Sequence, residues 1–289
     1  IFCGKTEMIV EPLPSETHQL VREARRAGKS VGCVPTMGAL HDGHLSLLRE
    51  SIAQNQYTVM SIFVNPTQFN NPEDLEKYPR TLEADVEKIK SVSQNILIYT
   101  PSVDDIYHGH TQSEHFDFDG LEHQMEGQFR PGHYDGVGTV VKKLFEIVRP
   151  TRAYFGEKDF QQLQIVKKMV EKLKIPVEII GCPIYRENNG LAMSSRNQRL
   201  NAEQRKQAAI LYKTLQAAQI KFKKNSANTV SKWVADRFEK IPDMKLEYFQ
   251  IADESELLPC ERKNKNKKYR AFIAVFIEKV RLIDTVALY

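Results

Sequence analysis

The sequence lacks the long apolar stretch that a membrane protein needs. No run approaches the roughly 20 uninterrupted apolar residues that cross a bilayer. Near the start of the chain, Glu7, Glu11, Pro12 and Pro14 interrupt any apolar segment of the kind that forms a secretion signal. We therefore expect a soluble protein with no membrane partner and no targeting segment.

Cysteines are also scarce. The chain has 4 of them, Cys3, Cys33, Cys182 and Cys260, which are far apart and form no CxxC pair. This spacing argues against a zinc ribbon, a redox motif and a disulfide framework. Reduced thiols in a cytoplasmic protein are the expected state.

The chain has little excess charge of either sign. Lys and Arg number 41 against 37 for Asp and Glu, which gives a net charge of +4, too small by itself to indicate nucleic acid. The run Arg262 to Lys268 is basic and polar, but no aromatic residue interrupts it. We expect an exposed loop there and no nucleic-acid partner, and an RNA-binding protein that uses this run is the alternative from another functional class.

The pattern of apolar residues predicts an α/β protein of two domains. In the first part, β-rich runs alternate with amphipathic segments, which indicates a Rossmann-like parallel sheet covered by helices. The expected strands are Met8 to Val10, Ser30 to Pro35, Tyr57 to Val64, Ile96 to Tyr99, Arg152 to Phe155 and Val177 to Ile180. The expected helices run from Ser15 to Gly28, Gly43 to Gln54, Thr81 to Ser91, Gly136 to Val148 and Phe160 to Leu173.

The pattern changes after Asn201. Two helical patterns, Ala202 to Lys223 and Asn228 to Lys240, precede two β-rich runs, Lys245 to Ala252 and Tyr269 to Glu278. We therefore expect residues 1–183 to form the Rossmann-like domain and residues 184–289 a smaller α+β domain.

One candidate site motif is PTMGALHDGH, residues 35–44, at a predicted strand-to-helix junction. Ligands bind at this edge of a wound sheet, glycines allow close approach of the backbone, and amide groups at a helix start favour phosphate. We favour a nucleotide phosphate site that includes His41 and His44. Helix-capping histidines, two ligands of a metal site, and neutral rings packed in a turn are the alternatives.

Two further motifs carry cations. In Gly156-Glu157-Lys158-Asp159 a lysine suits phosphate oxygens and an aspartate suits ribose hydroxyls, although such a turn is often only a polar loop. In Met193-Ser194-Ser195-Arg196 two hydroxyls and a guanidinium suit a triphosphate, although a helix-capping turn is the alternative. We expect this second loop to be mobile.

The segment FVNPTQF, residues 63–69, follows the most apolar predicted strand. The amides of Asn65 and Gln68 suit hydroxyl and carboxylate oxygens, while Asn-Pro by itself indicates only a turn.

These segments together resemble one known family. PTMGALHDGH, SIFVNPTQF, YPRTLEAD, RPGHYDGV, FGEKDFQQL and GLAMSSRN, in this order, are similar to pantothenate synthetases over nearly the first 200 residues. The HxGH and MSSR elements also resemble the wider nucleotidyltransferase group, including class I aminoacyl-tRNA synthetases. The last 90 residues match loosely, so a lid role for the second domain is by analogy.

The resemblance implies an ATP-dependent ligase. In the implied reaction, pantoate would attack ATP to give pantoyl-adenylate and pyrophosphate, and β-alanine would then displace AMP to give pantothenate. It implies magnesium as the companion of ATP and a homodimer. A nucleotidyltransferase that makes a dinucleotide or a CDP-linked product is the alternative within enzymes.

The resemblance also implies residue roles. His44 is the implied acid, and we interpret His41, His44, Lys158 and Arg196 mainly as electrostatic clamps on phosphate oxygens. Gln68 and Gln162 would hold pantoate, with Asn65 nearby, and Asp85 would help to position magnesium. The implied ATP-binding residues are Met37, Gly38, Ala39, Leu40, His41, Asp42, Gly43, His44, Gly156, Glu157, Lys158, Asp159, Tyr185, Met193, Ser194, Ser195 and Arg196.

The sequence departs from the family pattern at two positions. Thr67 replaces a common Met, and Tyr185 replaces a smaller aliphatic residue. We expect Thr67 to alter the apolar wall of the pantoate site, whereas Tyr185 matters less if only its backbone is used.

Overall fold

A computed structural model of the chain describes residues 9–289. By its internal contacts the chain divides into two compact units. Unit 1 comprises the residues up to Phe118, Arg130–Gly156 and Ile165–Cys182. Unit 2 comprises Asp119–Phe129, Glu157–Gln164 and Pro183–Tyr289. The expectation of a domain boundary between residues 183 and 184 stays a prediction.

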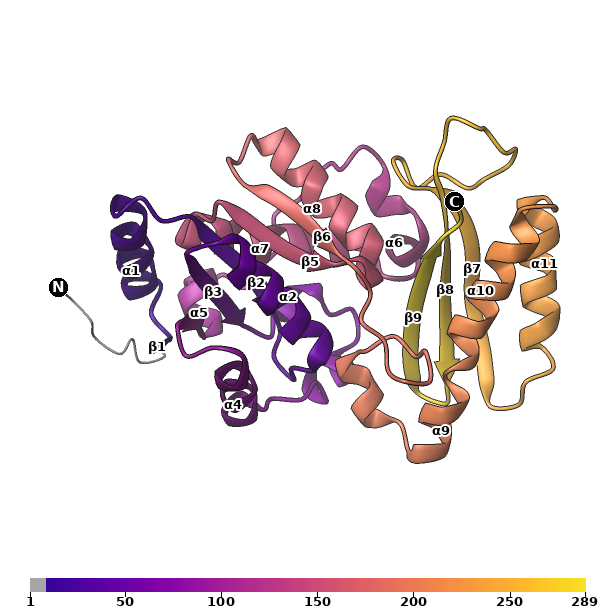
Figure 1. Cartoon of the computed structure of the whole chain (residues 1–289), viewed down its shortest axis with the longest axis horizontal. Coiled ribbons are helices and arrows are strands. Elements are labelled where there is room, and N and C mark those ends of the chain that lie inside the picture. The colour runs from indigo at the N-terminus through magenta and orange to yellow at the C-terminus, as the bar shows by residue number, and fades with distance from the viewer. Residues whose placement is uncertain (1–8) are drawn as a thin grey trace. The chain divides into compact units, whose positions relative to one another are not determined.

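The sheet of unit 1 is parallel throughout, as predicted. Among the described residues it has 6 strands in the order β1-β4-β3-β2-β5-β6 (Figure 1). They are β1 Ile9–Glu11, β2 Val31–Thr36, β3 Tyr57–Ile62, β4 Ile96–Tyr99, β5 Arg152–Gly156 and β6 Glu178–Cys182. The chain order reverses between β2 and β5, so the carboxyl ends of these two neighbours form the topological switch point at which wound sheets bind ligands. Met8, where we expected the first strand to begin, lies outside the described residues.

Helices pack on this sheet in two groups. Helix α1 contacts α7, and α2 contacts α4 as well as β2, β3 and β5. The long helices lie within a few residues of their predicted ranges, whereas α3, α5 and α6 are single short turns that show no periodicity in the sequence. The helices up to β6 are α1 Pro14–Arg26, α2 Asp42–Gln54, α3 Pro72–Glu76, α4 Leu82–Val92, α5 Val103–Tyr107, α6 Met125–Phe129, α7 His133–Val148 and α8 Phe160–Leu173.

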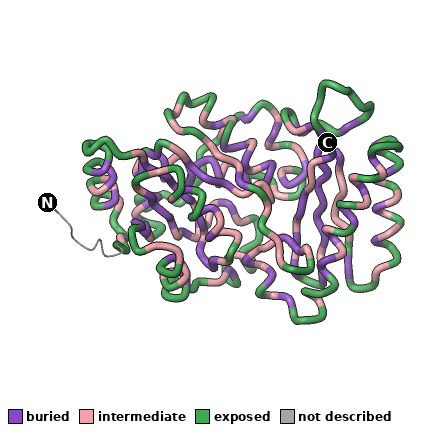
Figure 2. The backbone as a smooth tube through the Cα atoms, in the orientation of Figure 1, coloured by how far each residue is buried: buried purple, intermediate pink, exposed green. Residues whose placement is uncertain are grey.

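The core of unit 1 lies between α2, α4 and the central strands. Leu48, Met60, Ile89 and Ile98 are fully buried in one apolar cluster. Figure 2 shows the same distribution along the backbone, with buried residues concentrated in the strands. The burial of β3 and β4 on both faces explains why their sequences are nearly continuous in β-branched and other apolar residues.

Unit 2 is built around an antiparallel sheet, β7-β8-β9. Helices α10 and α11 pack on each other and on this sheet. Leu215, Val234, Ile273 and Val275 are fully buried in its core. The elements are α9 Ala202–Gln207, α10 Ile210–Phe222, α11 Ala227–Phe238, β7 Met244–Asp253, β8 Tyr269–Ile277 and β9 Val280–Ala287.

One expectation for this unit is wrong, and one strand was not predicted. The single helix Ala202 to Lys223 is two helices, because the chain tightens at Ala208 and Ala209, where Ala209 N–H bonds to the carbonyl of Lys206. Alanine has the highest helix propensity, so nothing local marks this break. Strand β9 was not predicted, since a buried aspartate, Asp284, interrupts its apolar pattern.

The loop Arg262–Lys268 joins β7 to β8 and is exposed throughout, as predicted. Lys263 donates to the carbonyl of Phe222, and Lys267 forms an ion pair with Glu256. No helix among residues 9–289 is long and apolar enough to cross a membrane.

Candidate active site

The segment from Met37 to Leu40 turns the chain from the end of β2 toward α2 in unit 1. Gly38 has a φ of +78°, a left-handed conformation that favours glycine. A Cβ at this position would lie 3.0 Å from Ile62 Cγ2 and 3.1 Å from Asp85 Oδ2. Both the backbone conformation and the surrounding side chains therefore require the glycine.

His41 and His44 cap the start of α2. His41 is the N-cap residue, its backbone N–H donates to Nδ1 of His44 at 3.3 Å, and the two ring centroids are 4.0 Å apart. The helix-capping alternative is thus confirmed, and it is compatible with ligand binding. Because Nδ1 of His44 accepts a hydrogen bond, the proton of a neutral ring is on Nε2, which makes Nε2 a donor.

Asp85 holds the same turn from α4. Its carboxylate is fully buried; Oδ2 accepts the N–H of Ala39 at 2.8 Å, and Oδ1 accepts the N–H of Leu40 at 2.7 Å. Thr81 donates to Oδ2 as well, at 3.1 Å. These contacts use the backbone N–H groups of Ala39 and Leu40. The magnesium role of Asp85 stays a prediction.

No cage for a metal ion is present in the described part of the chain. Residues 9–289 contain no group of three or more His, Cys, Asp or Glu side chains arranged to hold one. Within that range the pair of histidines therefore has no third protein ligand for zinc.

Asn65 and Gln68 lie next to each other after β3. Asn65 is 1% exposed and donates to Oε1 of Gln68 at 3.0 Å and to the carbonyl of Gly136 at 3.1 Å. Thr67 adds polar contacts, because its hydroxyl donates to Asn65 Oδ1 at 3.1 Å and lies 2.9 Å from the Tyr107 hydroxyl. The amide pair is therefore fixed by polar contacts from three directions. The effect of Thr67 on the apolar wall of the pantoate site stays a prediction.

Gln68 also joins the histidine motif to the RPGHYDGV segment. Its Nε2 donates to Met37 Sδ at 3.1 Å, and its carbonyl accepts from His133 Nδ1 at 2.8 Å and from Arg130 at 3.2 Å. We assigned no role to Arg130 or His133 from the sequence. Their only sequence signal is that both belong to a segment shared with the family.

In the GEKD segment, Gly156 ends β5 in unit 1, and Glu157–Asp159 form the short helix η3 in unit 2. Lys158 Nζ lies 3.7 Å from Asp159 Oδ2, and Glu157 accepts from the buried Arg270 at 3.3 Å. Gln161, which we did not select, is 3% exposed and bonds to the backbone of Leu121, Gln124 and Glu126. The next residue, Gln162, is half-buried.

The MSSR segment also belongs to unit 2 and runs into η4 Ser195–Arg199. Both η3 and η4 contact strand β9, so the two cationic motifs lie against one strand. Tyr185 is 44% exposed, and its carbonyl already accepts the N–H of Met193 at 3.0 Å. The carbonyl keeps a second lone pair for the backbone contact that the resemblance implies.

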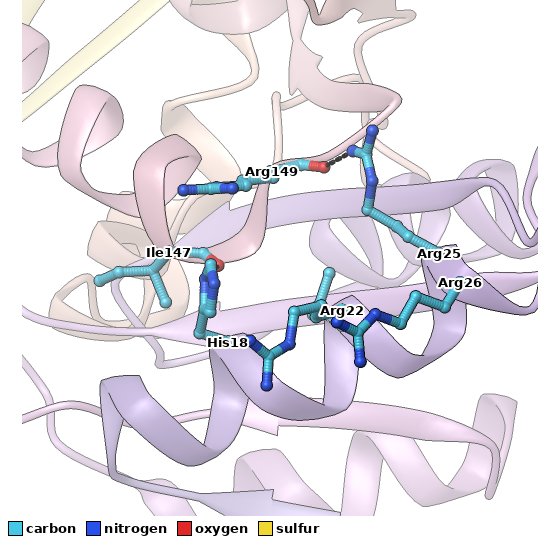
Figure 3. A pocket seen from close by; sticks show the side chains of 7 residues that line it. His18, Arg22, Arg25, Arg26, Ile147 and Arg149 are labelled. Atoms are coloured by element: carbon cyan, nitrogen blue, oxygen red, sulfur yellow. Dashed lines mark hydrogen bonds between the residues drawn. The ribbon is translucent and has the colours of Figure 1, made fainter.

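A pocket of about 230 Å³ lies elsewhere in unit 1, between α1 and the end of α7 (Figure 3). Arg25 donates to the carbonyl of Arg149, and His18 Nδ1 lies 3.1 Å from the carbonyl of Ile147. These side chains cap the last carbonyls of α7, where cations are favourable. The pocket contains none of the predicted site residues, and helix capping explains its charge.

Comparison with known proteins identifies the family. The chain matches the family model described as pantoate-beta-alanine ligase over residues 10–287. It is 65% identical to a pantothenate synthetase of Flavobacterium psychrophilum over 260 residues, which are 90% of this chain and 92% of the relative. It is 52% identical to the pantothenate synthetase of Christiangramia forsetii over 93% of this chain and 95% of that relative.

Solved structures agree with this comparison. Pantothenate synthetase of Thermus thermophilus superposes with a TM-score of 0.89 at 37% identity and covers 98% of this chain and 100% of its own. A pantoate-beta-alanine ligase of Francisella tularensis, solved in complex with beta-gamma ATP and beta-alanine, gives a TM-score of 0.80 at 34% identity over 97% and 98% of the two chains. The chain therefore belongs to the pantoate-beta-alanine ligase family.

Proposed function

We propose that this enzyme joins pantoate to β-alanine in two steps at the residues of the four motifs. In the first step a carboxylate oxygen of pantoate attacks the α-phosphorus of ATP, and the bond to the β-phosphate breaks to release pyrophosphate. In the second step the neutral amine of β-alanine attacks the acyl carbon, AMP leaves, and the amine loses a proton. The products are pantothenate, AMP and pyrophosphate.

The observation that carries the residue assignment is the hydrogen bond from the His41 backbone to Nδ1 of His44. It orients the imidazole at the start of α2 and places the proton of a neutral ring on Nε2. Negative charge grows on the phosphate oxygens as pyrophosphate leaves, so a fixed donor lowers the barrier more than it stabilises bound ATP. Little acid-base work is required, because the carboxylate of pantoate is already ionised at pH 7.

Lys158 and Arg196 supply positive charge in this proposal. A lysine ammonium contacts phosphate as a compact point charge, and an arginine guanidinium presents a planar fork of donors to two oxygens. Both belong to short helices that contact β9. Together they would stabilise the departing pyrophosphate.

Gln68 and Gln162 are the proposed ligands of pantoate, with Asn65 as the residue that fixes Gln68. The hydrogen bond from Asn65 to Oε1 orients the Gln68 amide, so its Nε2 group is directed rather than free to rotate. An oriented neutral amide binds a carboxylate or hydroxyl oxygen without the large cost of burying another charge.

Magnesium is proposed to arrive with ATP. Phosphate oxygens and water are the usual ligands of this ion when a protein offers no carboxylate cage.

A homodimer and a cytoplasmic location are further proposals, which rest on the family resemblance. Sedimentation velocity at micromolar protein concentrations would test the homodimer. A particle with the mass of a single chain at all concentrations would contradict it.

The reaction is tested by exchange of labelled pyrophosphate into ATP. Purified protein with magnesium should catalyse this exchange only when pantoate is present, and should release AMP only when β-alanine is added. Exchange that depends on a nucleotide or phosphate-bearing second substrate, and not on pantoate, would instead favour the dinucleotide or CDP-linked alternative.

The residue roles are tested by His44→Ala and Lys158→Ala. Each should lower turnover at least about 100-fold, because each removes a donor to the transition state. Circular dichroism would check that the fold is retained. Turnover near the wild-type value in a folded variant would remove that residue from the proposed site.

A further inference from the structure

The loop that carries Arg196 has a hydrogen-bond network of its own, and our expectation that this loop is mobile stays a prediction. Residues 185–193 form a tight turn in which Glu187 N–H bonds to the carbonyl of Leu191 at 2.8 Å and Gly190 N–H to the carbonyl of Glu187 at 2.8 Å. Gly190 has a φ of +92°. The turn therefore delivers the chain to Met193 in a defined direction.

Glu187 is the centre of this network. Its Oε1 accepts from Asn197 Nδ2 at 2.9 Å, and its two carboxylate oxygens accept from Nε and Nη2 of Arg205, each at 2.8 Å. The Glu187 side chain is 12% exposed. Glu187 thus links Asn197, the residue directly after Arg196, to the start of the turn and to Arg205 of α9.

Asn197 depends on these contacts. It is 3% exposed, its Nδ2 also donates to the carbonyl of Ala192 at 3.1 Å, and its backbone N–H donates to the carbonyl of Ser194 at 2.9 Å. The Asn197 side chain therefore ties both sides of the MSSR segment together. Loss of the Glu187 carboxylate would leave one of its amide hydrogens in a buried place without an acceptor.

The neighbouring Arg186 anchors the turn on its other side. It forms a two-pronged ion pair with Asp284 of β9, at 2.7 and 3.0 Å, and its guanidinium lies 3.7 Å from the centre of the Tyr212 ring. The start of the turn is therefore fixed to the sheet of unit 2. Through its hydrogen bond with Asn197, Glu187 connects this fixed end of the turn to the other side of the loop.

We propose that Glu187 is a positioning residue for ATP, which acts through Asn197 to hold Arg196 and the serines before it in the conformation that binds the phosphates. The proposal rests on the proposed function of the MSSR segment. The guanidinium of Arg205 neutralises the negative charge of the Glu187 carboxylate. A conformation fixed before ATP arrives saves the entropy of ordering the loop on binding, so its loss affects ATP more than pantoate.

Steady-state kinetics of the pyrophosphate exchange test this proposal. Glu187→Ala should raise KM for ATP about 10-fold or more and change KM for pantoate by less than about twofold. Glu187→Gln should remain within about threefold of wild type, because its amide oxygen still accepts from Asn197. A purely structural role would lower the active fraction and leave both KM values unchanged.

A double-mutant cycle identifies the partner. Asn197→Ala should raise KM for ATP to a similar extent, and Glu187→Ala combined with Asn197→Ala should be little worse than either change alone, since both remove one interaction. Additive effects of the two changes would overturn the transmission through Asn197. If Glu187→Ala fails to fold, Glu187→Gln and Asn197→Ala still decide the question.

Glu247→Ala is the matched control. Glu247 is 16% exposed and pairs with Arg281 in the same unit, but it contacts no predicted site residue. Its loss should lower the melting temperature without changing KM for ATP. If KM for ATP is unchanged in Glu187→Ala, the positioning role of Glu187 is overturned, although exchange by the wild type would still support the ligase function. If the wild type shows no exchange, both the positioning role and the ligase function are overturned.

Discussion

At the scale of single residues, Asp85 shows how one buried carboxylate can fix a turn of the backbone. It accepts two buried amide groups and a hydroxyl. Each hydrogen bond to a charged acceptor contributes about 1.5 to 3 kcal/mol. The turn between β2 and α2 therefore depends on a residue that is 45 positions away from Leu40.

Asp85→Ala should lower the free energy of unfolding by about 3 kcal/mol, because the N–H groups of Ala39 and Leu40 lose their acceptors. Urea denaturation would measure this loss. Asp85→Asn keeps one acceptor oxygen and should cost less. If Asp85 were a magnesium ligand, the main effect would be a higher magnesium requirement at unchanged stability, which would contradict the structural role.

Cys33 is a residue whose chemistry is suppressed by its position in β2. It is fully buried, and burial raises the pKa of its thiol to about 12 from an ordinary value of 9.0. Because the thiolate is the reactive form, native protein at pH 8 should leave Cys33 unmodified by iodoacetamide. Mass spectrometry would check this, with urea-unfolded protein as the control; rapid labelling of Cys33 in the native state would contradict it.

At the scale of elements, the amide pair depends on how closely α7 approaches the short helix η1 Pro66–Gln68. A Cβ added at Gly136 would lie 2.5 Å from the carbonyl oxygen of Thr67 and 2.8 Å from the Cα of Gln68. Both atoms belong to the backbone, so no rotamer change relieves the contact. Gly136 therefore sets the distance between these two elements.

Gly136→Ala should displace η1 and cost about 1 to 3 kcal/mol of unfolding free energy. If Gln68 binds pantoate as proposed, KM for pantoate should rise more than KM for ATP. Gly156→Ala is the stability control, because a Cβ there meets nothing within 4 Å. Wild-type stability and kinetics in Gly136→Ala would show that the two elements can separate freely.

At the scale of the whole molecule, buried titratable groups limit the pH range of stability. The pKa of Asp253 is below its ordinary 3.8: burial acts to raise it, but hydrogen bonds from Glu256 and Ser255 outweigh burial. The ionised Asp253 carboxylate therefore contributes to the free energy of unfolding above about pH 4, and this contribution is lost as the pH falls further. Burial raises the pKa values of Cys33 and Tyr99 above their ordinary 9.0 and 10.0.

For groups with a raised pKa the sign is opposite, since the folded state keeps a proton that the unfolded state releases. The free energy of unfolding should therefore fall as the pH rises past 9. Urea midpoints measured between pH 9 and 11 would test this decrease. In Cys33→Ala the decrease in stability with rising pH should be smaller. A midpoint that increases between pH 9 and 11 would contradict the assignment.

Local patterns in the sequence determined much of this protein by themselves. The parallel sheet, most long helices and the order of the motifs follow from periodicity and turn residues, which act over a few positions. The family follows from the same segments, because glycines and histidines with defined backbone roles must occur at fixed spacings.

Tertiary structure decided what those segments do for one another. The contacts of Asp85 with Leu40, of Gln68 with His133, and of Arg186 with Asp284 join residues that are 45, 65 and 98 positions apart. Side chains that meet over such separations leave no periodic signal, so the contacts of Asp85 with the turn and of Glu187 with Asn197, and strand β9, were not predicted. A hydrogen bond is set by position and orientation in space, and only the packed elements fix these.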